Sequence, residues 1–210
     1  MRVVVFGATG RTGRLLAQGA VVRGHDVTAF VRAPDELGAL QDRVRVVHSD
    51  VLDGGAVSDA VDGQDAVLVA LAGGGRKASQ QVNAQGTLNV IRSMQRYGVR
   101  RLVVLSAGGT RPDRDPNLSW FSERIVKPLF LRDVLADLRR MEISVRQSEL
   151  DWTIVRAARL VDEPAQGGYR AAPGYSLPGG AKIARADVAA FMLDELERRD
   201  NVAHAVAIAY

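Results

Sequence analysis

The chain has 210 residues, of which 47% are hydrophobic and 25% charged, and this suits one compact globular domain. It contains no cysteine, which excludes disulfides, cysteine-based metal sites and thiolate catalysis, and its three scattered histidines predict no metal site. The net charge of +4 comes from interspersed acidic and basic residues, without the basic block typical of nucleic-acid binding. No apolar run is long enough for a membrane span or an export signal, so we expect a soluble chain of the cytoplasm with no nucleic-acid or membrane partner.

Short apolar runs without polar alternation recur along the chain, and each predicts a strand buried on both faces, as in a parallel sheet. They are Val3–Phe6, Val27–Val31, Val44–Val47, Ala66–Ala70, Leu102–Leu105, Trp152–Val155 and Ala205–Ile208. Helical spacing predicts helices between them, at Gly13–Arg23, Val57–Val61, Val82–Tyr97, about Ser119–Gln147 and Ala186–Arg198. The alternation predicts an α/β fold in a single domain, residues 1–210, with a doubly wound parallel Rossmann sheet in a three-layer α/β/α arrangement.

Glycine and proline mark the ends of several predicted elements. Gly24 and Gly98 each follow a predicted helix, at a place where a left-handed residue commonly ends it. Pro128 lies inside the long helical segment and predicts a break that divides it into two helices. Glycines and prolines crowd residues 162–180, which we expect to form a long surface excursion.

The clearest functional pattern is the loop after the first strand, Gly7-Ala8-Thr9-Gly10-Arg11-Thr12-Gly13. Gly7 permits a tight turn off the strand, Gly10 lets the backbone approach a pyrophosphate, and Gly13 lets the next helix pack closely. The open N–H groups of that helix would face the phosphates. The first gap is one residue wider than in the usual dinucleotide fingerprint, and a plain strand-to-helix turn is the alternative. The strand and helix around the loop favour a dinucleotide site.

The end of the second strand bears on which dinucleotide would bind. An NAD site usually places a carboxylate there to hold the ribose 2′-hydroxyl, but this strand ends in Phe30-Val31-Arg32. Arg32 can pair with a 2′-phosphate, and Arg11 can cover the other face of the adenosine end. We therefore expect NADP in preference to NAD, with a solvated strand-end arginine as the alternative for Arg32.

Later strand ends add further candidates. Asp50 can accept a hydrogen bond from an adenine amino group, and Val51 can lie against the ring. The glycines at residues 73–75 indicate either close backbone approach to a ligand or a flexible loop. Ser106 ends the fifth strand, where it either positions a ligand or satisfies a turn, and we expect the positioning role. No histidine or aspartate partner that would make Ser106 a nucleophile is evident.

These motifs, with the strand LVVLSAGG and the run Ser148–Arg156, make the chain resemble the atypical short-chain dehydrogenase/reductases with an NAD(P)H-binding domain. It is most similar to the compact members related to biliverdin-IXβ/flavin reductase and to their NmrA-like relatives. The resemblance implies that Ser106 lies beside the nicotinamide and that Arg156 lies in the cofactor wall after the sixth strand, where Ala157 replaces the usual proline. It also implies cofactor contacts at Gly7, Thr9, Gly10, Arg11, Thr12, Gly13, Arg32, Asp50, Val51, Leu71, Ala72 and Gly73.

The chain departs from the family's usual catalytic pattern, Tyr-x-x-x-Lys, because none of its four tyrosines has a lysine four positions on. Reduction of a flavin, a quinone or a linear tetrapyrrole spreads charge over a conjugated system, so positioning can suffice while water delivers the proton. We therefore expect an NADPH-dependent oxidoreductase that transfers hydride to a flat conjugated acceptor. The alternatives are a non-catalytic NADP-sensing regulator of the NmrA-like kind and a nucleotide-sugar epimerase.

The small-molecule substrate should lie against a C-terminal segment of about residues 157–185. Aromatic and basic side chains of this segment and of the region after the fifth strand can form a pocket for a flat anionic ligand, with ordinary loop packing as the alternative. They are Tyr169, Arg170, Tyr175, Arg111, Trp120 and Phe121. We expect the protein to be a monomer or a homodimer.

Overall fold

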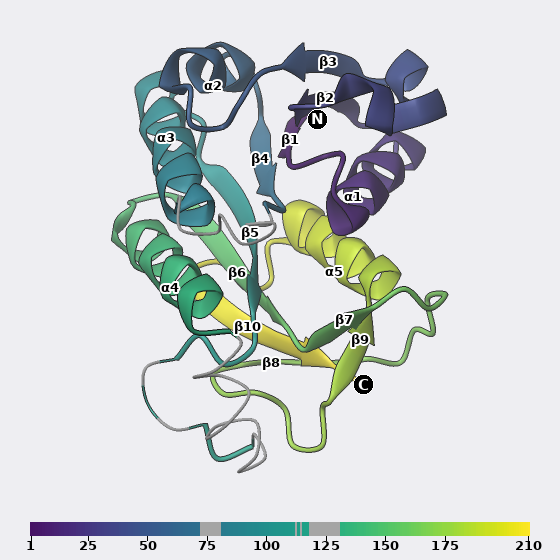
Figure 1. Cartoon of the computed structure of the whole chain (residues 1–210), viewed down its shortest axis with the longest axis vertical. Coiled ribbons are helices and arrows are strands. Elements are labelled where there is room, and N and C mark those ends of the chain that lie inside the picture. Colours follow the sequence, from purple (N-terminus) through teal and green to yellow (C-terminus); the bar gives the residue numbers. More distant parts are fainter. Residues whose placement is uncertain (72–80, 112, 114, 118–130) are drawn as a thin grey trace.

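The structure is a computed structural model of the whole chain, and it describes residues 1–71, 81–111, 113, 115–117 and 131–210. Its centre is an eight-stranded sheet in the order β3-β2-β1-β4-β5-β6-β10-β8 (Figure 1). Neighbouring strands of this sheet are parallel, except that β8 is antiparallel to β10. The strands are β1 (Arg2–Phe6), β2 (Asp26–Val31), β3 (Arg45–His48), β4 (Ala66–Val69), β5 (Arg101–Ala107), β6 (Asp151–Ala157), β8 (Arg170–Pro173) and β10 (His204–Ala209).

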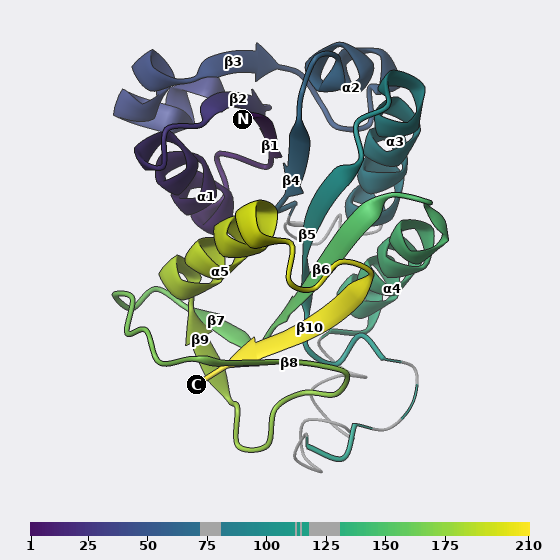
Figure 2. The same cartoon turned by 180° about the vertical axis from the view of Figure 1, so that it is seen from behind.

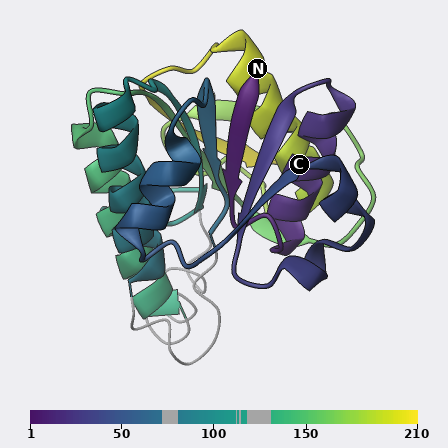
Figure 3. The same cartoon turned by 90° about the horizontal axis from the view of Figure 1, so that it is seen from above.

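Helices cover both faces of the sheet, as the view from above shows (Figure 3). They are α1 (Arg11–Val22), α2 (Gly54–Val61), α3 (Val82–Tyr97), α4 (Arg132–Gln147) and α5 (Arg185–Arg198), with a 3-10 segment, η1 (Pro34–Arg43), after β2. One apolar core joins the sheet to α1 and α5, and a second joins it to α2, α3 and α4. The architecture is the predicted three-layer Rossmann fold. No helix of the described residues is long and apolar enough to cross a membrane.

Strand β1 shows why the apolar runs form central strands. Val3 and Val5 belong to the core on the α1 and α5 side, while Val4 belongs to the core on the other side. All three are fully buried. Because successive side chains of a strand point to opposite faces, a strand buried on both faces needs apolar residues at every position.

Each of the predicted strands is found, and so are the predicted helices, with the last of them beginning at Arg185. Gly24 and Gly98 have φ angles of 78° and 71°, so both are left-handed residues after a helix, as predicted. Of the long helical segment, the structure describes α4, while Pro128 and the predicted break lie outside the described residues.

The stretch 162–180 lies at the surface, as predicted, since none of its residues is buried. Within it, Arg170–Pro173 form β8 at the edge of the main sheet, a strand that the sequence does not predict. Two further short strands, β7 (Arg159–Val161) and β9 (Lys182–Ala184), pair in a separate parallel sheet beside α5 (Figure 2). These strands have three or four residues each, too few for a hydrophobic period to be recognised, and prolines and glycines surround β8.

Candidate functional site

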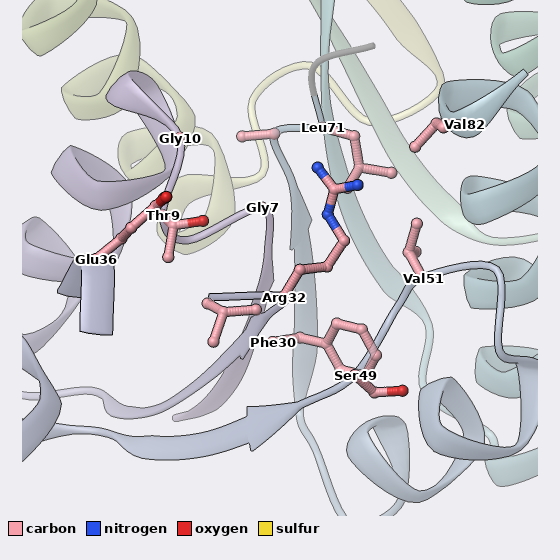
Figure 4. A pocket seen from close by; sticks show the side chains of 12 residues that line it. Gly7, Thr9, Gly10, Phe30, Arg32, Glu36, Ser49, Val51, Leu71 and Val82 are labelled. Carbon is pink, nitrogen blue, oxygen red and sulfur yellow. The ribbon is translucent and has the colours of Figure 1, made fainter. Parts of the chain in front are cut away.

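A cavity of about 230 Å³ lies at the carboxyl ends of the strands in the N-terminal half of the sheet (Figure 4). Its walls are formed by Gly7, Thr9, Gly10, Phe30, Val31, Arg32, Glu36, Ser49, Val51, Ala70, Leu71 and Val82. The order of the sheet reverses direction between β1 and β4, and this reversal is where open α/β sheets bind their ligands. The cavity therefore lies at the place that the topology favours for a ligand.

The glycine loop closes the floor of the cavity and needs glycine at two positions. Gly7 has a φ angle of +84°, and a Cβ atom there would lie 2.5 Å from the carbonyl oxygen of Ala70. A Cβ atom on Gly13 would lie 2.0 Å from the carbonyl oxygen of Gly7, well inside van der Waals contact. Both distances involve backbone atoms, which cannot rotate away. The loop can thus reach β4, and α1 can reach the loop, only with glycine at both positions.

The N-terminus of α1 faces the same loop and carries open hydrogen-bond donors. Gly10 is the N-cap residue, no side chain caps the helix, and its first turn contains no acidic residue. Among the described residues, no backbone acceptor pairs with the N–H groups of Arg11, Thr12 or Gly13. Unpaired N–H groups at the positive end of a helix dipole suit a phosphate. The cradle therefore fits the pyrophosphate of a dinucleotide.

Helix α3 shapes the opposite wall of the cavity. A Cβ atom on Gly86 would lie 2.7 Å from Val51 and 3.2 Å from Leu71, so only glycine lets the helix press these two side chains into the wall. Asn89 fixes the segment further by donating to the carbonyl oxygens of Val51 at 3.0 Å and Leu52 at 3.2 Å. Sequence reasoning missed Gly86 and Asn89. For Gly86 the sequence does contain a signal, because a glycine inside an otherwise regular helical pattern costs stability unless a close neighbour requires it. For Asn89 it contains none.

Some of the predicted cofactor residues line the cavity, some lie outside its lining, and two lie outside the described residues. Those that line the cavity are Gly7, Thr9, Gly10, Arg32, Val51 and Leu71, to which the structure adds Glu36 and Ser49. Outside the lining, the Asp50 carboxylate accepts a hydrogen bond from Leu52 N–H at 2.9 Å, in the turn that leads to α2. Thr12 is buried within α1. Ala72 and Gly73 lie outside the described residues.

Arg11 links the glycine loop to the C-terminal part of the chain. Its guanidinium group pairs with the Asp162 carboxylate at 2.6 Å, and the same carboxylate pairs with Arg185, at the start of α5, at 2.7 Å. Arg11 is still largely exposed, with 71% of its side-chain surface accessible. In this structure the Arg11 side chain forms an ion pair with Asp162 at the surface, and Arg11 is the first residue of α1.

Ser106 and Arg156 meet at a buried carboxylate that sequence reasoning missed, that of Glu142 on α4. Ser106 Oγ donates to Glu142 Oε1 at 2.8 Å, and the hydroxyl of Thr110 donates to the same oxygen at 2.8 Å. Arg156 adds two hydrogen bonds, from Nε at 3.0 Å and from a terminal nitrogen at 2.5 Å. These four side chains are all buried. We call them the Glu142 cluster.

The charge of Glu142 follows from these partners. Burial alone would raise the pKa of its carboxyl group. The positive charge and hydrogen bonds of Arg156, together with the hydrogen bonds from the two hydroxyls, outweigh burial and lower this pKa below its ordinary value. Glu142 is therefore ionised at neutral pH and only accepts hydrogen bonds. The single hydroxyl proton of Ser106 is already used in the hydrogen bond that Ser106 donates to Glu142, so Ser106 can only accept a hydrogen bond from any further partner.

All four tyrosines are described, and each has its contacts away from the Glu142 cluster. Tyr97 accepts from Ser58, Tyr175 donates to Asp113, Tyr210 donates to Asp187, and Tyr169 packs its ring against Phe191. Arg111 lies over the Tyr175 ring at 4.2 Å, so two of the side chains expected at an anionic pocket do come together. Trp120 and Phe121 lie outside the described residues. Within the described part of the chain, no group of three His, Asp or Glu side chains could hold a metal ion.

The fold, the glycine cradle and the cavity are those of a Rossmann domain that binds a dinucleotide. The model of the NAD(P)H-binding family matches residues 7–199, and the chain belongs to that family. A relative in Saccharomyces cerevisiae, UPF0659 protein YMR090W, is 28% identical over 93% of this chain and 87% of its own length. Three other relatives match only 49–57% of this chain, and the matched part spans 31–39% of their own length.

Solved structures share the fold over the whole chain. A putative NAD-dependent epimerase/dehydratase from Bacillus halodurans has a TM-score of 0.84 and 26% identity, covering 100% of this chain and 94% of its own. A short-chain dehydrogenase/reductase from Veillonella parvula in complex with NADP has a TM-score of 0.85 at 17% identity, covering 100% and 94%. ChuY, an anaerobillin reductase from Escherichia coli O157:H7, has a TM-score of 0.82 at 22% identity, covering 100% and 97%.

Proposed function

We propose that the protein is an NADPH-dependent oxidoreductase that transfers hydride to a flat conjugated acceptor of the flavin, quinone or tetrapyrrole type. The observation that carries the proposal is the glycine cradle, which aims the open N-terminus of α1 at a cavity that also contains Arg32. Bound there, NADPH would supply the hydride. Membership of the NAD(P)H-binding family supports the choice of a nicotinamide dinucleotide.

Each wall of the cavity has a role in this proposal. The N–H groups at the start of α1 bind the pyrophosphate, and the guanidinium fork of Arg32 binds the 2′-phosphate that distinguishes NADP from NAD. Val51 and Leu71, pressed inward by α3, contact the adenine ring. With its adenosine half held there, the cofactor would place its nicotinamide toward the carboxyl end of β5, where Ser106 is located.

The protonation of the Glu142 cluster supports the proposed acceptor class. Its carboxylate is ionised and Ser106 already donates to it, so neither residue offers a proton to an alkoxide at neutral pH. A conjugated acceptor spreads the charge that arrives with the hydride and can take its proton from water. Ser106 then orients a ring nitrogen or amide by accepting its hydrogen bond. ChuY, which shares the fold, is itself a reductase, so the fold can serve reduction.

Turnover of NADPH tests this proposal. We expect the purified chain to oxidise NADPH when FMN, a small quinone or biliverdin is present, and to leave an aldehyde or a ketone unreduced. The loss of nicotinamide absorbance measures the rate. Reduction of the aldehyde or ketone in preference to all the conjugated acceptors would contradict the assignment of the acceptor class.

The Glu142 cluster also favours a second candidate, a non-catalytic protein that senses NADP. Ser106 and Arg156, at the ends of β5 and β6, both donate to the Glu142 carboxylate on α4, as they would if their role were to hold the fold together. Such a sensor would bind NADPH in a titration and oxidise it with none of the acceptors. The same set of experiments therefore separates the two candidates.

A further inference from the structure

The cavity carries a second charged side chain, opposite in sign to Arg32. Glu36 lies in the first turn of η1, four residues beyond Arg32, and lines the same cavity. Figure 4 shows its side chain on the side of the glycine loop, with Thr9 and Gly10, whereas Arg32 extends across the cavity toward Leu71. The carboxylate that the end of β2 lacks is thus provided by the following element.

Glu36 is held in this place by the residues around it. Pro34 begins η1, and the N–H of Glu36 closes a turn by donating to the carbonyl oxygen of Ala33 at 3.1 Å. The next residue, Leu37, is 2% exposed and packs in the core with Leu40 and the apolar side of α1. Because Leu37 is buried, η1 cannot turn without losing core contacts. Its first turn therefore keeps Glu36 at the cavity.

A carboxylate and a guanidinium group act differently on the two dinucleotides. A carboxylate accepts hydrogen bonds from the ribose 2′- and 3′-hydroxyls of NAD, but it repels the 2′-phosphate of NADP. A guanidinium group attracts that phosphate through two parallel hydrogen bonds. Binding of each dinucleotide to this cavity is consequently favoured by one of the two side chains and opposed, or left unaided, by the other.

We infer that Glu36 is a specificity-determining residue, which accepts the ribose hydroxyls of NAD(H) and opposes NADP(H), so that the chain binds both dinucleotides. Arg32 and Glu36 together set the ratio of the two affinities. The inference rests on the proposed function in that the cavity must hold the adenosine half of the cofactor. The inference goes beyond the proposed function because it assigns NAD(H) as a second cofactor and names Glu36 as the residue responsible.

The test measures the affinities of the full chain for NAD⁺ and NADP⁺ by titration calorimetry. Replacing Glu36 by glutamine should tighten NADP⁺ and weaken NAD⁺, and shift the ratio of the two dissociation constants by about tenfold toward NADP⁺. Arg32→Gln should shift the ratio in the opposite direction. Adenosine 2′,5′-bisphosphate and adenosine 5′-phosphate, which contain only the adenosine end, should reproduce both shifts.

Asp35→Asn is the matched control, because it removes the same charge one residue earlier. Asp35 is exposed and is not part of the cavity wall. Its replacement should leave the ratio of dissociation constants within about twofold, since the exposed Asp35 does not line the cavity and water screens its charge from a ligand there. An equal shift in Asp35→Asn, or an unchanged ratio in Glu36→Gln, would overturn the role of Glu36.

The proposed function and this inference fail in distinguishable ways. If the unaltered chain binds neither dinucleotide, both are wrong. If it oxidises NADPH in the presence of a conjugated acceptor but Glu36→Gln leaves the ratio unchanged, only the inference is wrong. Thermal unfolding of each variant without ligand verifies that it folds, which the exposed position of Glu36 leads us to expect.

Discussion

At the scale of single residues, Glu142 joins parts of the chain that are distant in sequence. Its partners Ser106, Thr110 and Arg156 lie 36, 32 and 14 residues away. Such a constellation leaves no local pattern, and so the sequence predicts Ser106 and Arg156 as ligand contacts without their common partner. Glu36 is not predicted, for a different reason: a carboxylate that holds the ribose is expected at the end of β2, and the structure places one in the next element, η1.

We predict that Glu142→Gln destabilises the fold by about 3–5 kcal/mol, because it leaves the buried Arg156 guanidinium group without a counter-charge. Chemical denaturation at neutral pH measures this loss. Ser106→Ala and Thr110→Val are controls that each remove one hydroxyl from the carboxylate, and they should cost about 1.5–3 kcal/mol. A loss in Glu142→Gln no larger than in these controls would show that the ion pair contributes little.

The same pair gives a pH dependence with a defined sign. The pKa of Glu142 is lowered on folding from an ordinary value of 4.5, so the folded state binds its proton less readily than the unfolded chain. Its contribution to stability is therefore complete above pH 4.5 and is lost as the pH falls through the folded-state pKa. In acid, the free energy of unfolding of the unaltered chain should fall more steeply than that of Glu142→Gln. Parallel curves would contradict this assignment.

At the scale of elements, the sequence predicts the buried strands and the helices well, because short uninterrupted apolar runs indicate buried strands while the helices show a helical period. It fails at η1 and at β7, β8 and β9. The three strands are short, and tertiary contacts rather than local pattern hold them, as β8 depends on its pairing with β10. Segment η1 is interrupted at Gly38, so it has no regular helical period. The cavity follows the same division: the glycine loop can be recognised from its spacing, while the wall formed by η1 and α3 cannot.

The junction between the glycine loop and α1 gives a prediction of its own. Gly13→Ala should displace α1 from the loop, because its new Cβ atom would lie 2.0 Å from a backbone oxygen. We expect a destabilisation of at least about 1–3 kcal/mol and loss of dinucleotide binding. Gly54→Ala is the control, since its Cβ atom would meet nothing closer than 3.9 Å at the start of α2. Calorimetric titration measures the dinucleotide affinity of both variants, and chemical denaturation measures their stability. Dinucleotide affinity retained in Gly13→Ala would contradict the role of the loop.

At the scale of the whole molecule, the sheet joins the cavity to the C-terminal part of the chain. Strand β10, near the C-terminus, pairs with β6 and carries β8, and the core on the α1 and α5 side contains residues from β1 through β10. The terminal residue is tied back as well, since Arg170 donates to the carbonyl oxygen of Tyr210 at 2.8 Å. A core shared by both halves should unfold as one unit.

A ligand in the N-terminal half should therefore stabilise the entire chain. At a concentration one hundred times its dissociation constant, a dinucleotide should add about 2.7 kcal/mol and raise the unfolding midpoint by about 5–10 °C. Far-ultraviolet circular dichroism would follow the fold as a whole. The fluorescence of the buried Trp152 on β6, measured in a Trp120→Phe variant so that the other tryptophan does not contribute, would follow a part of the molecule that lies away from the cavity. Because β6 shares its core with β1 and β4, both signals should shift together. If Trp152 instead reported a separate transition that the dinucleotide left unmoved, the two halves of the sheet would be independent folding units.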